Sequence, residues 1–387
     1  MQAVERIRDY FVAQIKALRS PSINAQIIQK DHFLKYKELF AFLARHQRKL
    51  AEEIGQAYIN TIRWYYLNHF TRYEAALRAL KLHHIDKNDL IGQQDDPGLK
   101  RAARPAPATN DPFSLGRRMD ALKAPSRTAL SSYLAEEDKS AHFLETPFRF
   151  FNFALIDNAC FEYTFLSMFF APIQNFHAIS RTFNTIFAPT FALGQTLTKS
   201  LVGDPSADAL GVLLCVRLNG QMAFELQRRK VPAAEGYVNA TNILLWPRFQ
   251  QVMDLHCESL KRATTAISGR SGASSLLSSS SASSAAQSIA PHPLTQRFAS
   301  FLLGILTLSS EAGDGDEPVA RSLGRLRGEY ENFLMKLSKG VGEARKRERF
   351  LFNNFSLVGT ILEEASGNRL AEEHREHFAE LKETYAG

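Results

Sequence analysis

The residues best suited to covalent chemistry are a carboxylate, a thiol and an imidazole in the middle of the chain. Asp157, Cys160 and His177 hold the ingredients of a thiol nucleophile with a base. Phe161 follows Cys160 directly in a strongly apolar segment, so a cysteine packed in a helix core explains the same residue more simply. We therefore predict a protein without catalytic residues, and an enzyme that depends on Cys160 stays a minor alternative.

Pairs of histidines raise the question of metal binding. His83 and His84 are adjacent, so on a helix their side chains would point about 100° apart, and they suit a helix C-terminus, where positive charge is favoured. His374 and His377 could share a helix face, but the glutamates around them are typical of a solvated charged helix. The loop at 313–316 lacks the later oxygen ligands of a calcium loop, and no phosphate loop or dinucleotide fingerprint occurs. We predict no cofactor and no metal site.

Two carboxylates stand where acidic residues are unexpected. Asp157 and Glu162 interrupt a run of aromatic and aliphatic residues between Phe148 and Phe170. Such a residue either lies on an exposed edge or pairs with an arginine when it is buried. The aromatic run itself predicts the core of a helical bundle, with a groove for a partner helix as the functional alternative.

Basic residues form one short cluster that could contact a partner. The 387-residue chain has 47 basic and 40 acidic residues, and its net charge of +7 is mild for this length. Arg345, Lys346 and Arg347 stand together in an otherwise dispersed pattern. We predict that this cluster contacts a membrane surface or an acidic partner, against the alternative of an ordinary solvated helix face. We expect no binding of nucleic acid.

The elements that position these residues are helices. From about 31 to 82 the sequence has no proline and one glycine, and apolar residues recur in steps of three and four. This pattern predicts one continuous amphipathic helix, which would span roughly 75 Å. Asp31 is its predicted N-cap, and Gln47 is the one polar residue in its apolar line. Such a length favours a rod that bridges or tethers over a compact enzyme.

Prolines and glycines divide the rest of the chain into further helices, and strand signals are nearly absent. We expect a short first helix that ends near Pro21, a helix from Pro147 to about Pro172, and two helices separated at Pro189. Further helices are predicted from Asp204-Pro205 to Arg229, from Pro232 to about 267 with a kink or split at Pro247, and over 294–308, 318–337 and 343–383.

The same signals predict an all-α fold, an elongated rod of stacked antiparallel helical bundles. The predicted units are a long-helix segment at 1–92, a partly disordered Pro-rich polar loop at 93–140, a Phe-rich central bundle at 141–267, a Ser-rich disordered insert at 268–292 and a charged C-terminal helical segment at 293–387.

Signals for membrane insertion and disulfides are weak. Cys160, Cys215 and Cys257 are scattered and form neither a disulfide framework nor a zinc motif, so a reducing compartment is expected. The N-terminus lacks the apolar core of a signal peptide, and no window approaches about 18 uninterrupted apolar residues. The sequence predicts a soluble or peripheral protein.

Several motifs follow one another in a recognisable order. The striped segment at 36–80 is followed by KNDLIG at 87–92, ALIDN at 154–158, RKVPA at 229–233 and LLWPRF at 244–249. In this order and spacing, the chain from Gln2 to about Asn354 resembles the vacuolar protein sorting-associated protein 52 family. No single motif decides the resemblance, which rests on their arrangement.

The resemblance implies a non-enzymatic rod of the exocyst type, without a cofactor. It would serve the Golgi-associated retrograde protein complex and the related endosome-associated recycling complex, which tether endosome-derived vesicles and promote SNARE-driven fusion. The implied partners are the sibling subunits 51, 53 and 54, or the recycling counterpart of 54, together with Golgi Rab GTPases and syntaxin-type SNAREs. The implied location is the cytosolic face of trans-Golgi and endosomal membranes, where the protein would associate peripherally.

The chain also departs from the family pattern. The N-terminal coiled coil of the family would precede Met1, the C-terminal end is short, and the Ser-rich stretch at 268–290 is an addition. We interpret the chain as a fragment or a reduced member of the family. A soluble helical scaffold or a membrane-surface adaptor is the alternative function.

Overall fold

In a computed structural model the described part of the chain is almost entirely helical. The structure describes residues 2–93, 111–123, 139–273, 289–313, 317–365 and 367–386, with the backbone alone for 268–273. Its longer helices are α1 (Gln2–Ala17), α3 (Lys37–His46), α4 (Arg48–Arg78), α7 (Glu145–Phe169), α8 (Phe176–Val202), α9 (Ala209–Arg229), α10 (Glu235–Ala273), α12 (Pro293–Ser310), α13 (Glu317–Ser338), α14 (Ala344–Leu362) and α15 (Arg369–Thr384). The all-α prediction is confirmed.

Short elements join these helices. They are α2 (Ala25–Ile28), a π-helical turn η1 (Gln29–Leu34), the 3-10 turns η2 (Lys87–Asp89), η4 (Gly116–Met119) and η5 (Pro232–Ala234), and α5 (Asp120–Lys123). Two strands of two residues each, β1 (Lys81–Leu82) and β2 (Ala141–His142), pair in parallel, with Lys81 opposite Ala141.

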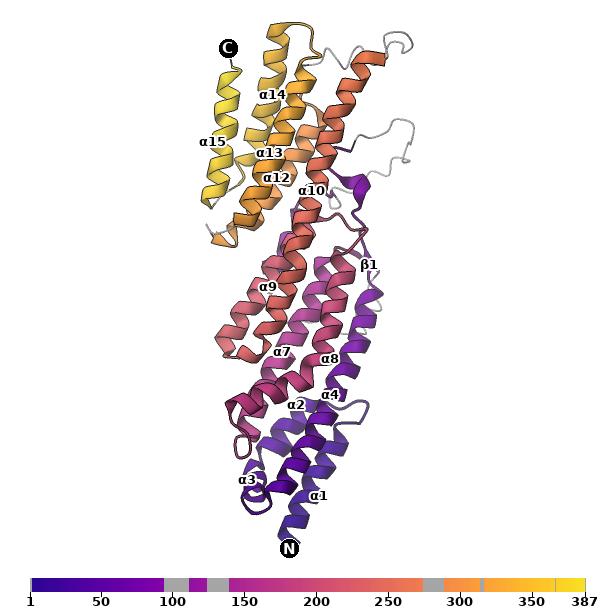
Figure 1. The fold of residues 1–387 in the computed structure, drawn as a ribbon, viewed down its shortest axis with the longest axis vertical. Helices are drawn as coiled ribbons and strands as arrows, with labels where there is room; N and C mark the ends of the chain where they lie inside the picture. Colours follow the sequence, from indigo (N-terminus) through magenta and orange to yellow (C-terminus); the bar gives the residue numbers. More distant parts are fainter. Residues whose placement is uncertain are drawn as a thin grey trace.

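The helices stack into an elongated molecule with its termini at opposite ends (Figure 1). Two long helices join the stack because each packs in two neighbouring bundles. The 31 residues of α4, roughly 46 Å long, pack on α1 and α3 near one end and on α7 and α8 in the middle. The 39 residues of α10, roughly 58 Å long, pack on α8 and α9 and then on α13. The predicted rod is confirmed.

The single helix predicted from 31 to 82 is wrong. The chain there forms η1, α3 and α4, and helical geometry is interrupted at Gln47, where φ is −143° and ψ is 63°. Asp31 therefore lies inside η1 and is not an N-cap. Phe40 of α3, before the interruption, stacks on Phe169 with 4.5 Å between ring centroids.

The far end of the predicted helix also differs. The α4 helix ends at Arg78, and His83 and His84 come after β1. The backbone N–H of His83 donates to the carbonyl of His142 at 2.8 Å, which extends the small parallel pairing. The predicted role of the two histidines at a helix C-terminus is therefore wrong.

Two prolines that were expected to end or split helices lie inside continuous ones. The α8 helix runs through Pro189, and α10 runs through Pro247. In α8, buried residues stand on both sides of the proline, with Phe187 before it and Leu197 after it. Packing against α4 and α7 holds this helix together across the hydrogen bond that proline removes. The predicted separation at Pro189 and the split at Pro247 do not occur.

Two other helices begin at capping residues that were not predicted from the sequence. The cap of α9 is Asp208, whose carboxylate accepts from the N–H of Gly211 at 2.9 Å, and not Asp204. The helix predicted over 343–383 is two helices. Gly367 sits between α14 and α15 with φ +105°, and Asn368 then caps α15 by accepting from Ala371.

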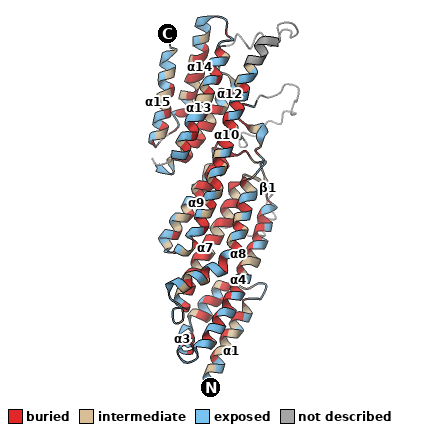
Figure 2. Cartoon of the chain, in the orientation of Figure 1, coloured by how far each residue is buried: buried red, intermediate tan, exposed pale blue. Residues whose placement is uncertain are grey.

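One continuous hydrophobic core follows the inner faces of the stacked helices (Figure 2). Five phenylalanines of the aromatic run have at most 1% of their surface exposed: Phe148, Phe151, Phe165, Phe169 and Phe170. The predicted bundle core at 148–170 is thereby confirmed. The division into units stays a prediction, since the core is not interrupted at those boundaries.

Part of the predicted polar loop is folded. Residues 111–123 form η4 and α5 and bury Phe113, Leu115 and Leu122. The rest of that loop, at 94–110 and 124–138, lies outside the described residues. In the Ser-rich segment, the backbone of α10 continues to Ala273, and 274–288 again lies outside the described residues.

Candidate interaction surfaces

The structure does not assemble the thiol nucleophile. Cys160 is buried in α7, and burial raises the pKa of its thiol to about 11, so little thiolate exists at neutral pH. Asp157 pairs with Arg229 at 2.7 Å, and His177 is exposed at the start of α8. Within the described part of the chain no hydrogen bond joins His177 to Cys160. The interpretation of Cys160 as a packed core residue is confirmed.

Metal binding finds no support among the described residues, where no cluster of three potential ligands occurs. His374 differs from its prediction, because only 1% of its surface is exposed and it is not solvated. It lies with Ala371 and Phe378 on the buried face of α15. Burial, together with nearby Arg327, lowers the pKa of His374 to about 3. His377 lies at the edge of this contact, 2.6 Å from Glu331.

The two unexpected carboxylates have different environments. Asp157 is exposed at the edge of α7 and paired with Arg229, whereas Glu162 is completely buried and forms no ion pair with an arginine in the described part of the chain. Glu162 instead accepts hydrogen bonds from the hydroxyls of Tyr58 at 2.7 Å and Tyr66 at 2.8 Å. The amide of Gln29 donates to it at 2.6 Å. Burial raises the pKa of Glu162, and these bonds only partly oppose the shift.

A buried arginine joins three elements near the middle of the molecule. The guanidinium of Arg118, from η4, donates to Glu145 of α7 and to Asp208 before α9, each at 2.7 Å at the closest. Burial disfavours the charged form of Arg118 and so lowers its pKa. The carboxylates of Asp208 and Glu145 together have a larger effect, and the pKa of Arg118 is raised. This cluster fixes the segment at 111–123 against the bundle. It is a structural cluster because its polar atoms are occupied by one another.

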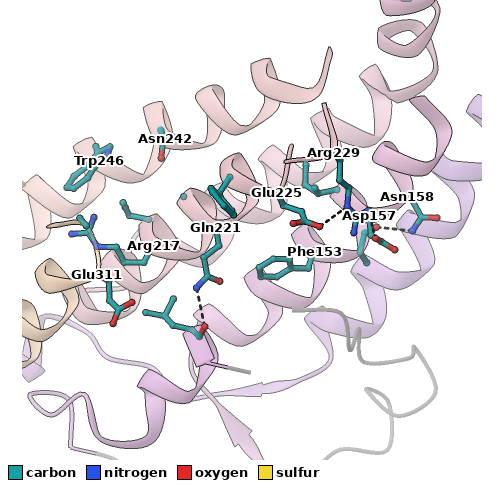
Figure 3. Close-up of a pocket in the computed structure, with 17 residues that line it drawn as sticks. Phe153, Asp157, Asn158, Arg217, Gln221, Glu225, Arg229, Asn242, Trp246 and Glu311 are labelled. Carbon is teal, nitrogen blue, oxygen red and sulfur yellow. Dashed lines mark hydrogen bonds and ion pairs between the residues drawn. The ribbon is translucent and has the colours of Figure 1, made fainter. Parts of the chain in front are cut away.

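An open groove of about 770 Å³ crosses α7, α9 and α10 (Figure 3). Its apolar lining includes Phe153 of α7, Trp246 of α10 and Phe224 of α9. The side chain of Phe224 is unusually open to solvent, with 68% of its surface exposed. Gly220 stands one turn before it, and no atom comes within 4 Å of the position of an added Cβ. The groove therefore offers an aromatic side chain beside an open backbone.

Both ends of the groove are polar. At one end Arg229 bridges Asp157 and Glu225, at 2.7 Å to each (Figure 3). The hydrogen bond from Arg228 lowers the pKa of Glu225 to about 2, although this carboxylate is only partly buried. At the other end Arg217 donates to the carbonyl of Leu308 at 2.8 Å. An apolar centre between ordered polar groups is the kind of surface that can bind a helix.

The predicted basic cluster lies at the start of α14. Arg345 and Lys346 are exposed there, and Lys346 is 2.9 Å from Glu343. Arg347 instead turns inward, and its guanidinium is 3.4 Å from the carbonyl of Val341. Arg349 is exposed one turn later, with its guanidinium 5.1 Å from the ring centre of Phe352. The exposed basic surface therefore comprises Arg345, Lys346 and Arg349.

Sequence reasoning missed the groove, although one signal for it was present. The outward positions of α9 are Arg217, Gly220, Phe224 and Arg228, spaced by three and four residues. A phenylalanine in such a stripe is out of place if the stripe only faces water. Trp246 of α10 is half-buried and lines the same groove.

One described helix, α9, reaches the length and mean hydropathy of a membrane-spanning segment. Within that window 67% of the residues are buried inside the protein, as in the core helix of a bundle. Its neighbours are α7, α10 and α12. The apolar composition of α9 is thus accounted for by its packing.

Comparison with known proteins extends these observations. A family model described as the C-terminal region of Vps52 matches residues 60–386, and one described as the Vps52/Sac2 family coiled coil matches residues 1–43. The expectation that the coiled coil of the family would precede Met1 is therefore wrong, since the coiled-coil model matches the first 43 residues of this chain. Vacuolar protein sorting-associated protein 52 of Schizosaccharomyces pombe is 33% identical over 385 residues, which cover 99% of this chain and 71% of that protein.

Other relatives carry the same name. The Saccharomyces cerevisiae protein is 33% identical over 395 residues, covering 93% of this chain and 60% of that protein. The human homologue is 26% identical over 371 residues, covering 95% of this chain and 48% of that protein. This chain thus spans about half of the human protein and most of the fission yeast one. Since a family model covers most of its length and a relative above 30% identity aligns over nearly all of it, the chain belongs to the Vps52 family.

Proposed function

We propose that the chain is a non-enzymatic subunit of a multisubunit vesicle-tethering complex. The observation that carries this proposal is membership of the Vps52 family, whose relatives are named for vacuolar protein sorting. The complex would be the Golgi-associated retrograde protein complex or its endosomal recycling counterpart. The chain would act on the cytosolic face of trans-Golgi and endosomal membranes, as a peripheral protein that helps SNARE-dependent fusion.

The fold supports this proposal in two ways. An elongated stack of bundles keeps surfaces at its two ends apart, which is what a tether requires (Figure 1). Several weak contacts along such a rod gain strength together, because each one raises the effective concentration for the next. The proposed partners are the sibling subunits 51, 53 and 54 or the recycling counterpart of 54, Golgi Rab GTPases and syntaxin-type SNAREs.

Purification from cell extract tests the proposal. The tagged chain is expressed in cells and recovered under mild conditions, and the proteins that accompany it are identified by mass spectrometry. We expect the sibling subunits in amounts comparable to that of the chain. Recovery of the chain without any of them, from cells that contain the complex, would count against a tethering subunit.

The groove allows a sharper version of this experiment. Phe224→Ala removes the most exposed aromatic side chain of the groove, whereas Phe176→Ala removes a similarly exposed phenylalanine, 58% exposed, at the start of α8. If the groove holds a partner helix, recovery of at least one partner falls with Phe224→Ala and not with the control. Equal recovery with both variants would remove the groove from the assembly.

A soluble helical scaffold or membrane-surface adaptor is the second candidate. The exposed basic residues at the start of α14 favour it, since an adaptor needs a surface that binds membranes without a complex. Purification distinguishes the two functions, because an adaptor would be recovered without stoichiometric sibling subunits.

A further inference from the structure

The first turns of α14 carry mainly positive charges, which are unfavourable at the start of a helix. Between residues 336 and 349 the sequence has six basic and two acidic residues. A helix N-terminus bears partial positive charge, so basic residues there are unfavourable and acidic ones favourable. Six other helices follow this preference with a glutamate in the first turn: α1, α3, α7, α10, α13 and α15. The α14 helix has no acidic residue in its first turn.

The exposed basic side chains share one outward face with apolar groups. Arg345, Lys346 and Arg349 lie on the side of α14 opposite its buried residues Phe350 and Leu351. Of the three, Lys346 alone makes an ion pair in the described part of the chain, with Glu343, and both side chains of that pair are at least half exposed. An exposed pair of this kind contributes little to stability.

Apolar side chains adjoin this basic face. Arg349 lies against the ring of Phe352, which is half-buried. The carbonyl of Ile289 accepts from the side chain of Asn353 at 2.7 Å, which places Ile289 beside the same part of α14. The side chain of Ile289 is 42% exposed. Cations next to exposed apolar groups are the pattern of a surface that rests in the headgroup layer of a membrane.

This surface also lies at one extremity of the molecule. The turn that joins α13 to α14 is at the end of the rod that also holds the C-terminus, opposite the N-terminus (Figure 1). A surface at a tip can meet a flat bilayer without interference from the rest of the rod. The short helix α3, by contrast, lies near the other end (Figure 1).

We propose that the tip formed by Arg345, Lys346 and Arg349, with Ile289 and Phe352 beside them, binds the anionic surface of a phospholipid bilayer. The proposal deepens the tethering function and rests on it, since it says which end of the rod meets a membrane. Anionic headgroups would pair with the exposed cations Arg345, Lys346 and Arg349, and Ile289 would enter the headgroup layer. The interaction is electrostatic, so it weakens as salt rises.

Sedimentation with vesicles tests this proposal. The whole chain is mixed at low salt with vesicles of phosphatidylcholine and phosphatidylserine in equal parts, or with phosphatidylcholine alone. We expect binding to the first kind only, with a clear decrease near ~0.15 M salt. Replacing the three basic residues with glutamine should weaken binding on the order of 100-fold, as each basic residue near such a surface contributes about fivefold.

A matched control removes the same number of charges elsewhere. Arg45, Arg48 and Lys49 are exposed beside the interruption between α3 and α4, and their replacement by glutamine lowers the net charge equally. This control should bind vesicles as the unchanged chain does. An equal loss in both triple variants, or binding to neutral vesicles, would overturn the proposal.

Four further measurements complete the test. Ile289→Ser should weaken binding several-fold at unchanged charge. The triple variant at α14 should keep its melting temperature, because the substitutions remove charges that oppose the helix dipole. Binding to soluble polyglutamate but not to anionic vesicles would assign the tip to an acidic protein and overturn the membrane proposal. If the triple variant still recovers sibling subunits, its failure to bind vesicles leaves the tethering function intact.

Discussion

At the scale of single residues, Glu162 is the clearest case of a side chain whose surroundings decide its chemistry. The sequence marks it as an acidic residue in an apolar helix and allows either exposure or an arginine partner. The structure shows neither, because the partners Tyr58, Tyr66 and Gln29 come from segments 96 to 133 residues away in the sequence. Uncharged hydrogen-bond donors that lie so far away along the sequence leave no local sequence pattern from which they could be predicted. The identity of such a partner can be learned only from the fold.

The raised pKa of Glu162 predicts how its contribution to stability varies with pH. At acid pH the carboxyl is protonated in both the folded and the unfolded chain, so the contribution is complete. As pH rises above about 4.3, Glu162 ionises first in the unfolded chain, because burial raises the pKa of this group in the folded chain. Its ionisation therefore stabilises the unfolded chain. Stability from this group therefore falls with rising pH until the folded pKa is passed.

Comparison with Glu162→Gln isolates this effect, since glutamine does not titrate. We expect the free energy of unfolding of the unchanged chain to fall relative to that of the variant as pH rises above about 4.3. Denaturant unfolding at a series of pH values measures the difference. A difference independent of pH would show that Glu162 ionises as it does in water. Glu162→Ala should cost at least about 1–3 kcal/mol, because buried hydroxyls lose their acceptor.

The thiol of Cys160 gives a second prediction at this scale. Its pKa of about 11 and its burial should protect it from alkylation in the folded chain at neutral pH. Labelling with iodoacetamide, followed by peptide mass spectrometry, should modify Cys160 slowly in the native protein and rapidly in denaturant. Rapid labelling of the native chain at Cys160 would restore the discarded hypothesis of a reactive cysteine.

At the scale of elements, the sequence predicts which segments are helical better than where they end. Apolar spacing identifies α7 and α8 because their buried faces recur every three or four residues. The interruption at Gln47 and the continuity across Pro189 and Pro247 depend on packing with distant helices, which spacing does not reveal. The polar Gln47 in an apolar line was the single local hint of an interruption.

A glycine at a helix crossing tests this dependence on packing. A Cβ added at Gly194 of α8 would lie 2.2 Å from the hydroxyl oxygen of Tyr237 and 3.0 Å from Phe151. Gly194→Ala should therefore separate α8 from its neighbours and cost about 1–3 kcal/mol, in spite of the better helix propensity of alanine. Thermal or denaturant unfolding measures the change.

Gly324 of α13 is the matched control, since no atom comes within 4 Å of its added Cβ. Gly324→Ala should stabilise the protein by about 0.5–1 kcal/mol, because alanine favours the helix and meets no obstacle. Equal stability of the two alanine variants would contradict the explanation that close packing between α8 and α10 requires glycine at residue 194.

At the scale of the whole molecule, the rod was predicted for a reason that is partly wrong. The predicted rod rested on one continuous helix of about 75 Å. In the structure the elongated shape results from α4 and α10, each of which packs in two neighbouring bundles. The groove across α7, α9 and α10 is a product of the same stacking, so the sequence offers a hint of it in the outward Phe224 but does not reveal its walls.

Solution scattering measures the shape directly. A compact protein of 387 residues would have a radius of gyration of about 21 Å. The stacked arrangement should give a value clearly above this and a pair-distance distribution with a long tail. A radius near the compact value would mean that the bundles fold back on one another in solution.

The continuity of α10 carries the last prediction. If this helix fixes the C-terminal bundle to the central one, a flexible Gly-Ser-Gly-Gly insertion after the exposed Gln251 should release them from each other. The scattering of this variant should show a wider range of shapes, while its helical content stays nearly constant. The same insertion in the turn between α13 and α14, after Gly340, crosses no shared helix and should leave the shape unchanged. Equal scattering from both insertions would show that the bundles are held together by their facing side chains, and that the shared helix adds no constraint of its own.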